Sequence, residues 1–398
     1  MSAGAGEARI ERVLGRVGIE RAPHHVLGVA VFCLALVARV GYWAISGTGV
    51  GAESENFVDF CTALASDPSS VPSAIEATTG VGTTAYWLLY SGYWGPMCGI
   101  YAPTGGSLDA VVLAQVLASS LTPVLLFYAA YRLVDLTAAT VAGVAMALLM
   151  DTFAWSTRVL TDSPFVFVLA LTVWQLARYR SDPTRRNRLL VWGCFVWLSV
   201  TRPNGIALVL GWLVYDLFPE EHGLRPNVFP YRSVAIGGAV LAIPVLIAVV
   251  VGALTFVADH WRAGYIIAND PVFTYEYTPR PSDSTIGFFF ANLDHLLILA
   301  VLKVAVFFLP VVDRFALVHN VANVAVLLPV TLLSFVGAYW AVRRETLLAR
   351  DWLTPYAVTV AIIAGTHVDY SWGYRAPATV LMVLLAGYAV SEARNKAA

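Results

Sequence analysis

The sequence predicts an all-α polytopic membrane protein with about ten transmembrane helices, within a range of nine to eleven. Of its 398 residues, 58% are hydrophobic and only 13% are charged, whereas soluble domains carry roughly 45–50% apolar and about 25% charged residues. Apolar stretches of about 20 residues, the length that crosses a bilayer as a helix, recur along the chain. No segment long enough for a sizeable soluble domain remains between them, which excludes a nucleic-acid-binding protein.

The chain divides into a cytoplasmic tail, residues 1–24, and a single transmembrane domain, residues 25–398. The tail is rich in Arg with Glu interspersed, as in a solvated surface segment. The fifth and sixth expected spans are short and meet at Pro203 and Gly205, so one hairpin bent there is the alternative to two spans. The expected spans are residues 25–46, 109–131, 136–153, 163–178, 189–201, 203–218, 233–257, 321–342, 352–367 and 376–391.

The distribution of Lys and Arg predicts the orientation in the cell membrane. With the N-terminus in the cytoplasm, most of the 25 Lys and Arg residues fall in segments on that side, as the positive-inside rule requires. Both termini are then cytoplasmic. The first and fourth extracytoplasmic loops, residues 47–108 and 258–320, are long, and we expect them to carry interfacial helices.

Residues 285–312 are the weak point of this topology, because they are long enough to form a further span. Asp294, His295 and Lys303 interrupt the apolar run. We therefore expect a helix that lies in the outer interface. If the segment spans instead, every later segment is inverted.

Four groups of ionisable side chains fall on the predicted outer face. Acidic loop residues are usually just solvated, an Asp-Ser-Pro sequence is a normal helix start, and Arg side chains often reach toward lipid headgroups. Their recurrence at one depth nevertheless favours a site, since ionisable groups there are costly without partners. The groups are Glu53, Glu55 and Asp59 in the first loop, Arg158 with Asp162, Arg202, and Tyr374 with Arg375.

Carboxylates that meet cations at a lipid interface suit the transfer of a sugar from a polyprenyl phosphate. The lipid phosphate leaves as an anion, so cations must stabilise its charge. A carboxylate must take the proton from the acceptor hydroxyl. A divalent metal is able to bridge the phosphate and the acidic groups.

The order of these motifs resembles the GT-C superfamily of integral-membrane glycosyltransferases. It is similar to the glycosyltransferase family 39-like branch, which includes the protein O-mannosyltransferases and the aminoarabinose transferase of lipid A. The family usually has an Asp followed by an aromatic residue in the first motif; Glu53 with Phe57 fits that spacing best, and Glu55 and Asp59 remain alternatives. The motifs here are residues 53–60, 161–165, 201–205 and 372–377, the last with Tyr before Arg.

This resemblance implies a polyprenyl (dolichyl) phosphate-linked sugar donor and transfer on the extracytoplasmic face, with inversion at the anomeric carbon. The acceptor would be a hydroxyl of a glycan, a glycolipid or a protein. The first-loop acid would act as general base, and Asp162 would assist it or hold a divalent cation (Mg or Mn) with Glu53. The donor phosphate would be contacted by Arg202, Arg375, Tyr374 and Arg158, with Arg262 and Lys303 as weaker candidates.

Two of the four cysteines, Cys61 and Cys98, lie in the first outer loop. An oxidising exterior would allow them to pair, and two free thiols are the alternative. Cys33 and Cys194 fall within apolar runs, where a cysteine serves as a small core residue.

Two other classes of function stay open. A transporter or flippase of a lipid-linked or polar substrate is the main alternative, but that class tends to show inverted repeats, and the sequence has no internal repeat. A non-catalytic membrane protein that binds glycans is the other, because Glu53 stands where the family usually has Asp.

Overall fold

The computed structural model describes residues 23–66, 89–217, 267–269, 274–276, 278–311, 315–344, 349–365 and 372–397. These residues are largely helical and also include a short antiparallel pair, β1 (Ile267–Asn269) and β2 (Thr274–Glu276). The span expected at 233–257, Arg262 and nearly all of the N-terminal tail lie outside the described residues.

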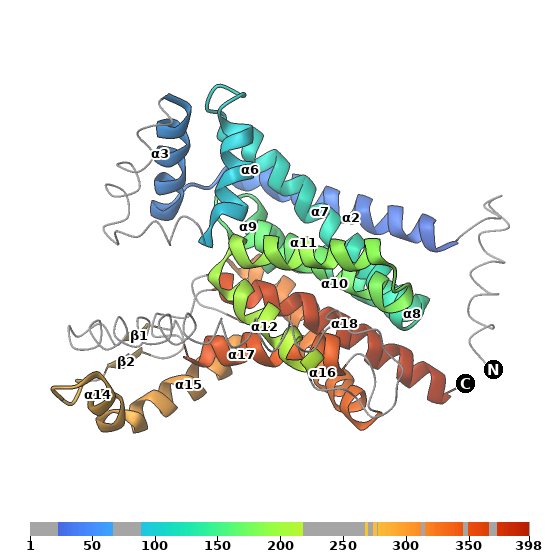
Figure 1. Ribbon diagram of the computed structural model, residues 1–398. Helices are drawn as coiled ribbons and strands as arrows, with labels where there is room; N and C mark the ends of the chain where they lie inside the picture. The colour runs from blue at the N-terminus through green and yellow to red at the C-terminus, as the bar shows by residue number, and fades with distance from the viewer. Residues whose placement is uncertain are drawn as a thin grey trace.

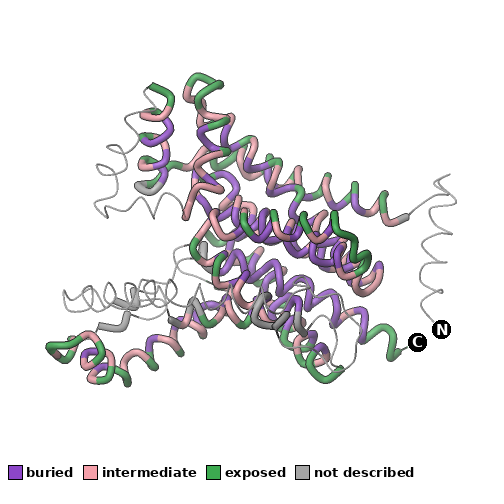
Figure 2. The backbone as a smooth tube through the Cα atoms, viewed as in Figure 1, coloured by how far each residue is buried: buried purple, intermediate pink, exposed green. Residues whose placement is uncertain are grey.

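A bundle of helices forms the body of the molecule (Figure 1). Its members are α2 (Pro23–Ser46), α7 (Leu108–Leu133), α8 (Leu136–Leu148), α10 (Asp162–Ser181), α11 (Arg185–Thr201), α12 (Pro203–Leu217), α16 (Leu317–Arg343), α17 (Thr354–Gly365) and α18 (Trp372–Ala397). The core is formed around α18, which packs against α16, α8 and α10. Every residue of α18 from 375 to 389 is buried (Figure 2), as expected for a helix that is apolar on all sides.

Four of the described helices, α2, α7, α16 and α18, are long and apolar enough to cross a membrane. The number rises to six if two bent pairs each count as one span: α8 with α9 (Met150–Ser156), and α14 (Thr285–Ala291) with α15 (Leu293–Phe308). The spans expected where α10, α11, α12 and α17 lie are helical but do not meet the same measure of length and apolarity. A helical protein with several spans is confirmed, and the count of about ten stays a prediction.

The span expected at 136–153 is broken between α8 and α9. Leu149 is extended, with φ −65° and ψ 107°, and the two helices meet at a bend of 53°. A break frees backbone carbonyls, which need donors where water is excluded. Arg39 of α2 supplies one: its Nη1 donates to the carbonyl of Ala147 at 3.3 Å, while its Nε donates to Ser119 Oγ at 2.7 Å. The buried Arg39 therefore braces the break.

The segment expected to lie in the outer interface, 285–312, is also bent. α14 and α15 meet at 70°, and Asn292 occupies the break, where its side-chain amide donates to the carbonyls of Phe288 and Arg280. α15 packs against α17. By length and composition this pair is a broken span or a re-entrant loop, so its interfacial position stays a prediction.

The two ends of the bundle differ. The start of α2 and the end of α18 lie together at one end, on the right of Figure 1. At the opposite end lie α3 (Ala52–Ser66), α6 (Ser91–Tyr101), the β1–β2 pair and α14. The described parts of the two long loops therefore share one end of the bundle.

The expected bend between the fifth and sixth spans lies at the junction of α11 and α12. Arg202 is extended between them, and the backbone amide of Gly205 donates to its carbonyl at 2.9 Å. A Cβ at Gly205 would lie 2.1 Å from the carbonyl oxygen of Leu198. The close approach of the two helices therefore requires glycine.

The close contact between α16 and α18 at Gly337 leads to a testable prediction. A Cβ at Gly337 of α16 would lie 2.0 Å from the carbonyl oxygen of Leu385 in α18, so Gly337→Ala must push the two helices apart. We expect a clear fall in the thermal unfolding midpoint of the protein in detergent.

Gly193→Ala is the matched control, because nothing lies within 4 Å of a Cβ there. In a helix this change is neutral or favourable by up to about 1 kcal/mol. Equal unfolding midpoints for the two variants would contradict the α16–α18 packing.

Candidate active site at one end of the bundle

The first long loop begins against the connection between α9 and α10. The backbone amide of Gly49 donates to the carbonyl of Thr157 at 2.9 Å, and the amide of Val159 donates to the carbonyl of Gly49 at 3.0 Å. This pairing places the start of α3 beside the segment that carries Arg158 and leads to Asp162. The exposed Arg158 side chain lies with its guanidinium 5.6 Å from the ring centroid of Trp155.

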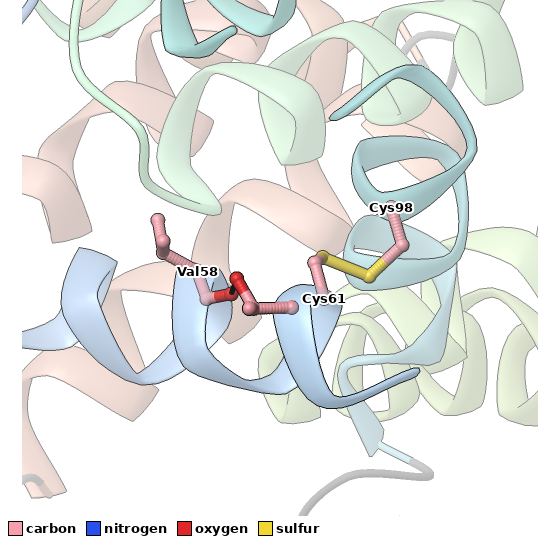
Figure 3. Close-up of a disulfide and its surroundings, with 4 residues drawn as sticks. Val58, Cys61 and Cys98 are labelled. Carbon is pink, nitrogen blue, oxygen red and sulfur yellow. Dashed lines mark hydrogen bonds between the residues drawn. A yellow bond between two sulfur atoms is a disulfide. The ribbon is translucent and has the colours of Figure 1, made fainter. Parts of the chain in front are cut away.

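A disulfide between Cys61 and Cys98 joins α3 to α6 (Figure 3). Beside it, the hydroxyl of Thr62 donates to the carbonyl of Val58 at 2.8 Å. The buried face of α3 carries Phe57 and Phe60, which belong to one apolar cluster with Tyr93, Met97 and Val159. The helix that bears the candidate acids is thus held by a covalent bond and by packing.

Two of the three candidate acids on α3 point away from this cluster. Glu55 and Asp59 are exposed, and the side chain of Glu53 lies outside the described residues. The structure therefore places Glu55 and Asp59 at the same end of the bundle as Arg158, on the solvent side of α3.

Asp162 and Arg202 form an ion pair at this end. Arg202 Nη1 donates to Asp162 Oδ1 at 2.5 Å, and the two side chains are 14% and 7% exposed. Asp162 is the first residue of α10, and the N-cap residue is Thr161, whose side chain makes no capping bond. The Asp162 carboxylate therefore pairs with Arg202 rather than capping the helix.

A largely apolar cavity of about 210 Å³ lies next to this pair, between α6, α7, α10 and α11. Tyr93 lines it and donates from its hydroxyl to Gln115 Oε1 at 3.3 Å. Burial, and then the charge of Asp162, raise the pKa of Tyr93. Pro164, two residues after Asp162, and Trp197 line it too.

A second ionic cluster ties three other helices together around Asp151 of α9. Asp151 Oδ1 accepts from His319 Nε2 at 2.8 Å and from Asn323 Nδ2 at 3.1 Å. Asp151 Oδ2 accepts from Arg375 Nε at 2.9 Å and also from Arg375 Nη2. Arg375 Nη1 donates to the carbonyl of Leu309 at the end of α15 at 2.5 Å.

Arg375 and Arg202 belong to different ion pairs. The side chain of Arg375 is 0% exposed and pairs with Asp151, whereas Arg202 pairs with Asp162. Lys303 is buried on α15, and the side chain of Tyr374 lies outside the described residues. The predicted roles of these residues toward a phosphate stay predictions.

Asp151, His319 and Asn323 were not predicted from the sequence. Asp151 falls inside the stretch assigned to the third span, and His319 falls just before the eighth. The position of Asp151 within an expected span could have indicated a buried ion pair, because an ionisable residue within a span usually has a partner. That partner is Arg375, which we had expected to contact a phosphate.

The described side chains do not fit a metal site. In that part of the chain no group of three His, Cys, Asp or Glu side chains gathers, and the Asp162 carboxylate is bound by Arg202. The predicted ligand pair of Asp162 and Glu53 is not tested, because the side chain of Glu53 is not described.

The long apolar helices indicate a multi-pass membrane protein, and the described ionic groups gather in its helical bundle. Residues 99–248 match the family model described as dolichyl-phosphate-mannose-protein mannosyltransferase. The match spans α7 to α12 and includes Asp151, Arg158, Asp162 and Arg202. It confirms the resemblance to GT-C-type membrane glycosyltransferases over these residues. A search of curated proteins found no match.

The disulfide predicts the pattern of thiol labelling. In denatured, unreduced protein only Cys33 and Cys194 should react with a maleimide, and all four cysteines should react after reduction. Cys61→Ser should lower the free energy of unfolding by about 2–4 kcal/mol, whereas Cys33→Ser, at an exposed position, should change it little. Four labels before reduction, counted by mass spectrometry, would show that the bond is absent.

The Asp151–Arg375 pair predicts a strong energetic coupling. Arg375→Met leaves a buried carboxylate without its cation and should destabilise the protein by about 3–5 kcal/mol in chemical unfolding. Adding Asp151→Leu to that variant should restore much of the loss, because neither charge then remains buried. Arg280→Met is the control, since its pair with Asp294 is half exposed and should matter little. Additive effects of the two substitutions would count against the pair.

Proposed function

We propose that the protein is a glycosyltransferase that moves a sugar from a polyprenyl-phosphate donor to an acceptor hydroxyl on the extracytoplasmic face of the membrane. The observation that carries the proposal is the Asp162–Arg202 pair. It lies next to an apolar cavity and at the bundle end that carries α3, within a chain whose residues 99–248 match a mannosyltransferase family model.

The donor has a charged and an apolar part, and this end of the bundle offers a place for each. Arg202 is 14% exposed, so its guanidinium can both hold Asp162 and reach a phosphate. The cavity lined by Tyr93, Phe167 and Trp197 suits the first units of an isoprenoid chain, which gain free energy when they leave water. The exposed Arg158 provides a second cation.

Transfer then proceeds in a single displacement with inversion at the anomeric carbon. A carboxylate of α3 takes the proton of the acceptor hydroxyl, the hydroxyl oxygen bonds to the anomeric carbon, and the bond from that carbon to the phosphate oxygen breaks. Arg202 stabilises the departing lipid phosphate. Asp162 keeps Arg202 in place; its low exposure, 7%, suits this role better than that of a base.

The acid that serves as base is Glu53, Glu55 or Asp59. Glu55 and Asp59 are exposed to an incoming acceptor, whereas Glu53 lies nearest the Gly49–Arg158 pairing along the chain. The extracytoplasmic position of the site follows from the excess of Lys and Arg in the segments expected on the other side.

A transporter or flippase is the second candidate, because helices broken near functional residues are typical of transporters. The helix pairs α8–α9 and α14–α15 are both bent at a break. The absence of an internal repeat in the sequence favours the transferase.

Sugar transfer by the purified protein in proteoliposomes tests the proposal. Three variants, Glu53→Gln, Glu55→Gln and Asp59→Asn, each remove one candidate base. The variant that removes the catalytic acid should lower the rate by about 10²–10⁴-fold. Asp162→Asn should also lower it, because Arg202 loses its partner.

Asp283→Asn, a change at an exposed acid outside α3 and α10, should leave the rate unchanged. Full transfer by all four site variants, each correctly inserted, would refute the catalytic assignment. Movement of an intact lipid-linked substrate without a new glycosidic bond would favour the transporter.

A further inference from the structure

Gln115 is a polar side chain in the apolar wall of the cavity between α6, α7, α10 and α11. α7 lines this cavity with Val111, Ala114, Gln115 and Ala118, which share one face of the helix because they are three or four residues apart. Gln115 is 6% exposed. A buried amide costs free energy unless its donors and its acceptor are bonded, so the partners of Gln115 indicate its role.

The side-chain amide of Gln115 connects α7 to two other parts of the chain. Its Nε2 donates to the carbonyl of Arg158 at 2.7 Å and to the carbonyl of Ser156 at 3.4 Å. Its Oε1 accepts from the hydroxyl of Tyr93 at 3.3 Å. The end of α9 and the segment after it are thereby joined to α6, the helix that the disulfide links to α3.

The segment that carries Arg158 is held by two elements. Gly49 of the first outer loop bonds to the residues on either side of Arg158, since it donates to the carbonyl of Thr157 and accepts from the amide of Val159. Gln115 of α7 bonds to the carbonyl of Arg158 itself. The position of the Arg158 backbone against the cavity wall therefore depends on Gln115.

The other two charged residues of the candidate site also lie beside this wall. Pro164, two residues after Asp162, lines the cavity. Gly92 lines it too, and a Cβ at Gly92 would lie 2.6 Å from the hydroxyl oxygen of Thr201, the residue before Arg202. An apolar chain in the cavity would therefore contact the same elements that place the charges.

We propose that Gln115 is a positioning residue for the lipid-linked donor. It holds the Arg158 segment against the cavity, so that the phosphate lies within reach of Arg158 and Arg202 when the isoprenoid chain fills the cavity. The inference rests on the proposed function and names the side chain that connects the apolar part of the donor site to its charged part. Gln115 acts through the backbone of Arg158 and does not touch the phosphate.

The binding test compares two lipids that differ only in the phosphate. Full-length protein in detergent is titrated with polyprenyl monophosphate or with the corresponding polyprenol, and each Kd is obtained from the rise in the unfolding temperature. Gln115→Met keeps the length of the side chain and removes the amide. It should weaken binding of the monophosphate about tenfold, the effect of losing one charge-assisted hydrogen bond, and leave binding of polyprenol unchanged because the wall stays apolar.

Gln175→Met is the matched control. Gln175 is also a buried glutamine, 4% exposed, and its Oε1 accepts from Arg178. It lies on α10 about 20 Å from Asp162, at a rise of about 1.5 Å per residue, so its loss should leave both affinities unchanged. If Gln115→Met fails to fold, Tyr93→Phe removes one hydrogen bond to the amide and should weaken monophosphate binding in the same direction by a smaller factor.

Sugar transfer provides a second readout. At saturating donor, Gln115→Met should lower kcat about 10²-fold, because a small misplacement of the reacting phosphate has an effect of this size. A variant that was merely less stable would keep kcat once folded.

Two results would overturn the proposal: an unchanged affinity of Gln115→Met for the monophosphate, or an equal loss of affinity for both lipids, which would mean that Gln115 only shapes the cavity. Failure of the proposed function looks different. In that case wild type binds the monophosphate more tightly than polyprenol but transfers no sugar, and loss of that difference in Gln115→Met would still support the positioning role. Equal binding of the two lipids by wild type would overturn both.

Discussion

The packing of α9 on α16 and α18 depends on the ion pair and hydrogen bonds of the Asp151 carboxylate. It accepts hydrogen bonds from His319, Asn323 and Arg375, and so joins α9 to α16 and α18. A charge in this position is tolerable only when its lone pairs are occupied and its charge is matched. The break between α8 and α9 brings Asp151 to these partners, and Arg39 takes up a carbonyl that the break releases. The buried acid thus pairs with the buried Arg375, and the buried Arg39 braces the bend beside it.

The candidate active site is held together by different means. Backbone hydrogen bonds join Gly49 to the segment at Arg158, and the Cys61–Cys98 disulfide joins α3 to α6. The apolar cluster of Phe57, Phe60, Tyr93 and Met97 with Val159 adds packing to these links. The covalent bond and the Gly49 pairing hold the acids of α3 at the bundle end that carries Asp162 and Arg202, where the proposed sugar transfer requires them.

The membrane class and the helical character were predictable from the sequence, because apolar stretches of bilayer length dominate it. The resemblance to GT-C glycosyltransferases was predictable from the order of the motifs, and the family match over 99–248 confirms it there. The break at Leu149 was not, since no Pro or Gly marks it and the apolar pattern runs through it. The partner of Arg375 was also hidden: residues 151 and 375 are far apart in the sequence, and only the packing of α9 on α18 brings them together.

A structure of the protein in lipid nanodiscs with polyprenyl monophosphate bound would test the central claim most directly. The account predicts the phosphate at the end of the bundle that carries α3 and α6, in contact with Arg202. The first isoprenoid units should lie in the cavity lined by Tyr93 and Trp197. A phosphate bound at the other end of the bundle, where α2 begins and α18 ends, would contradict it.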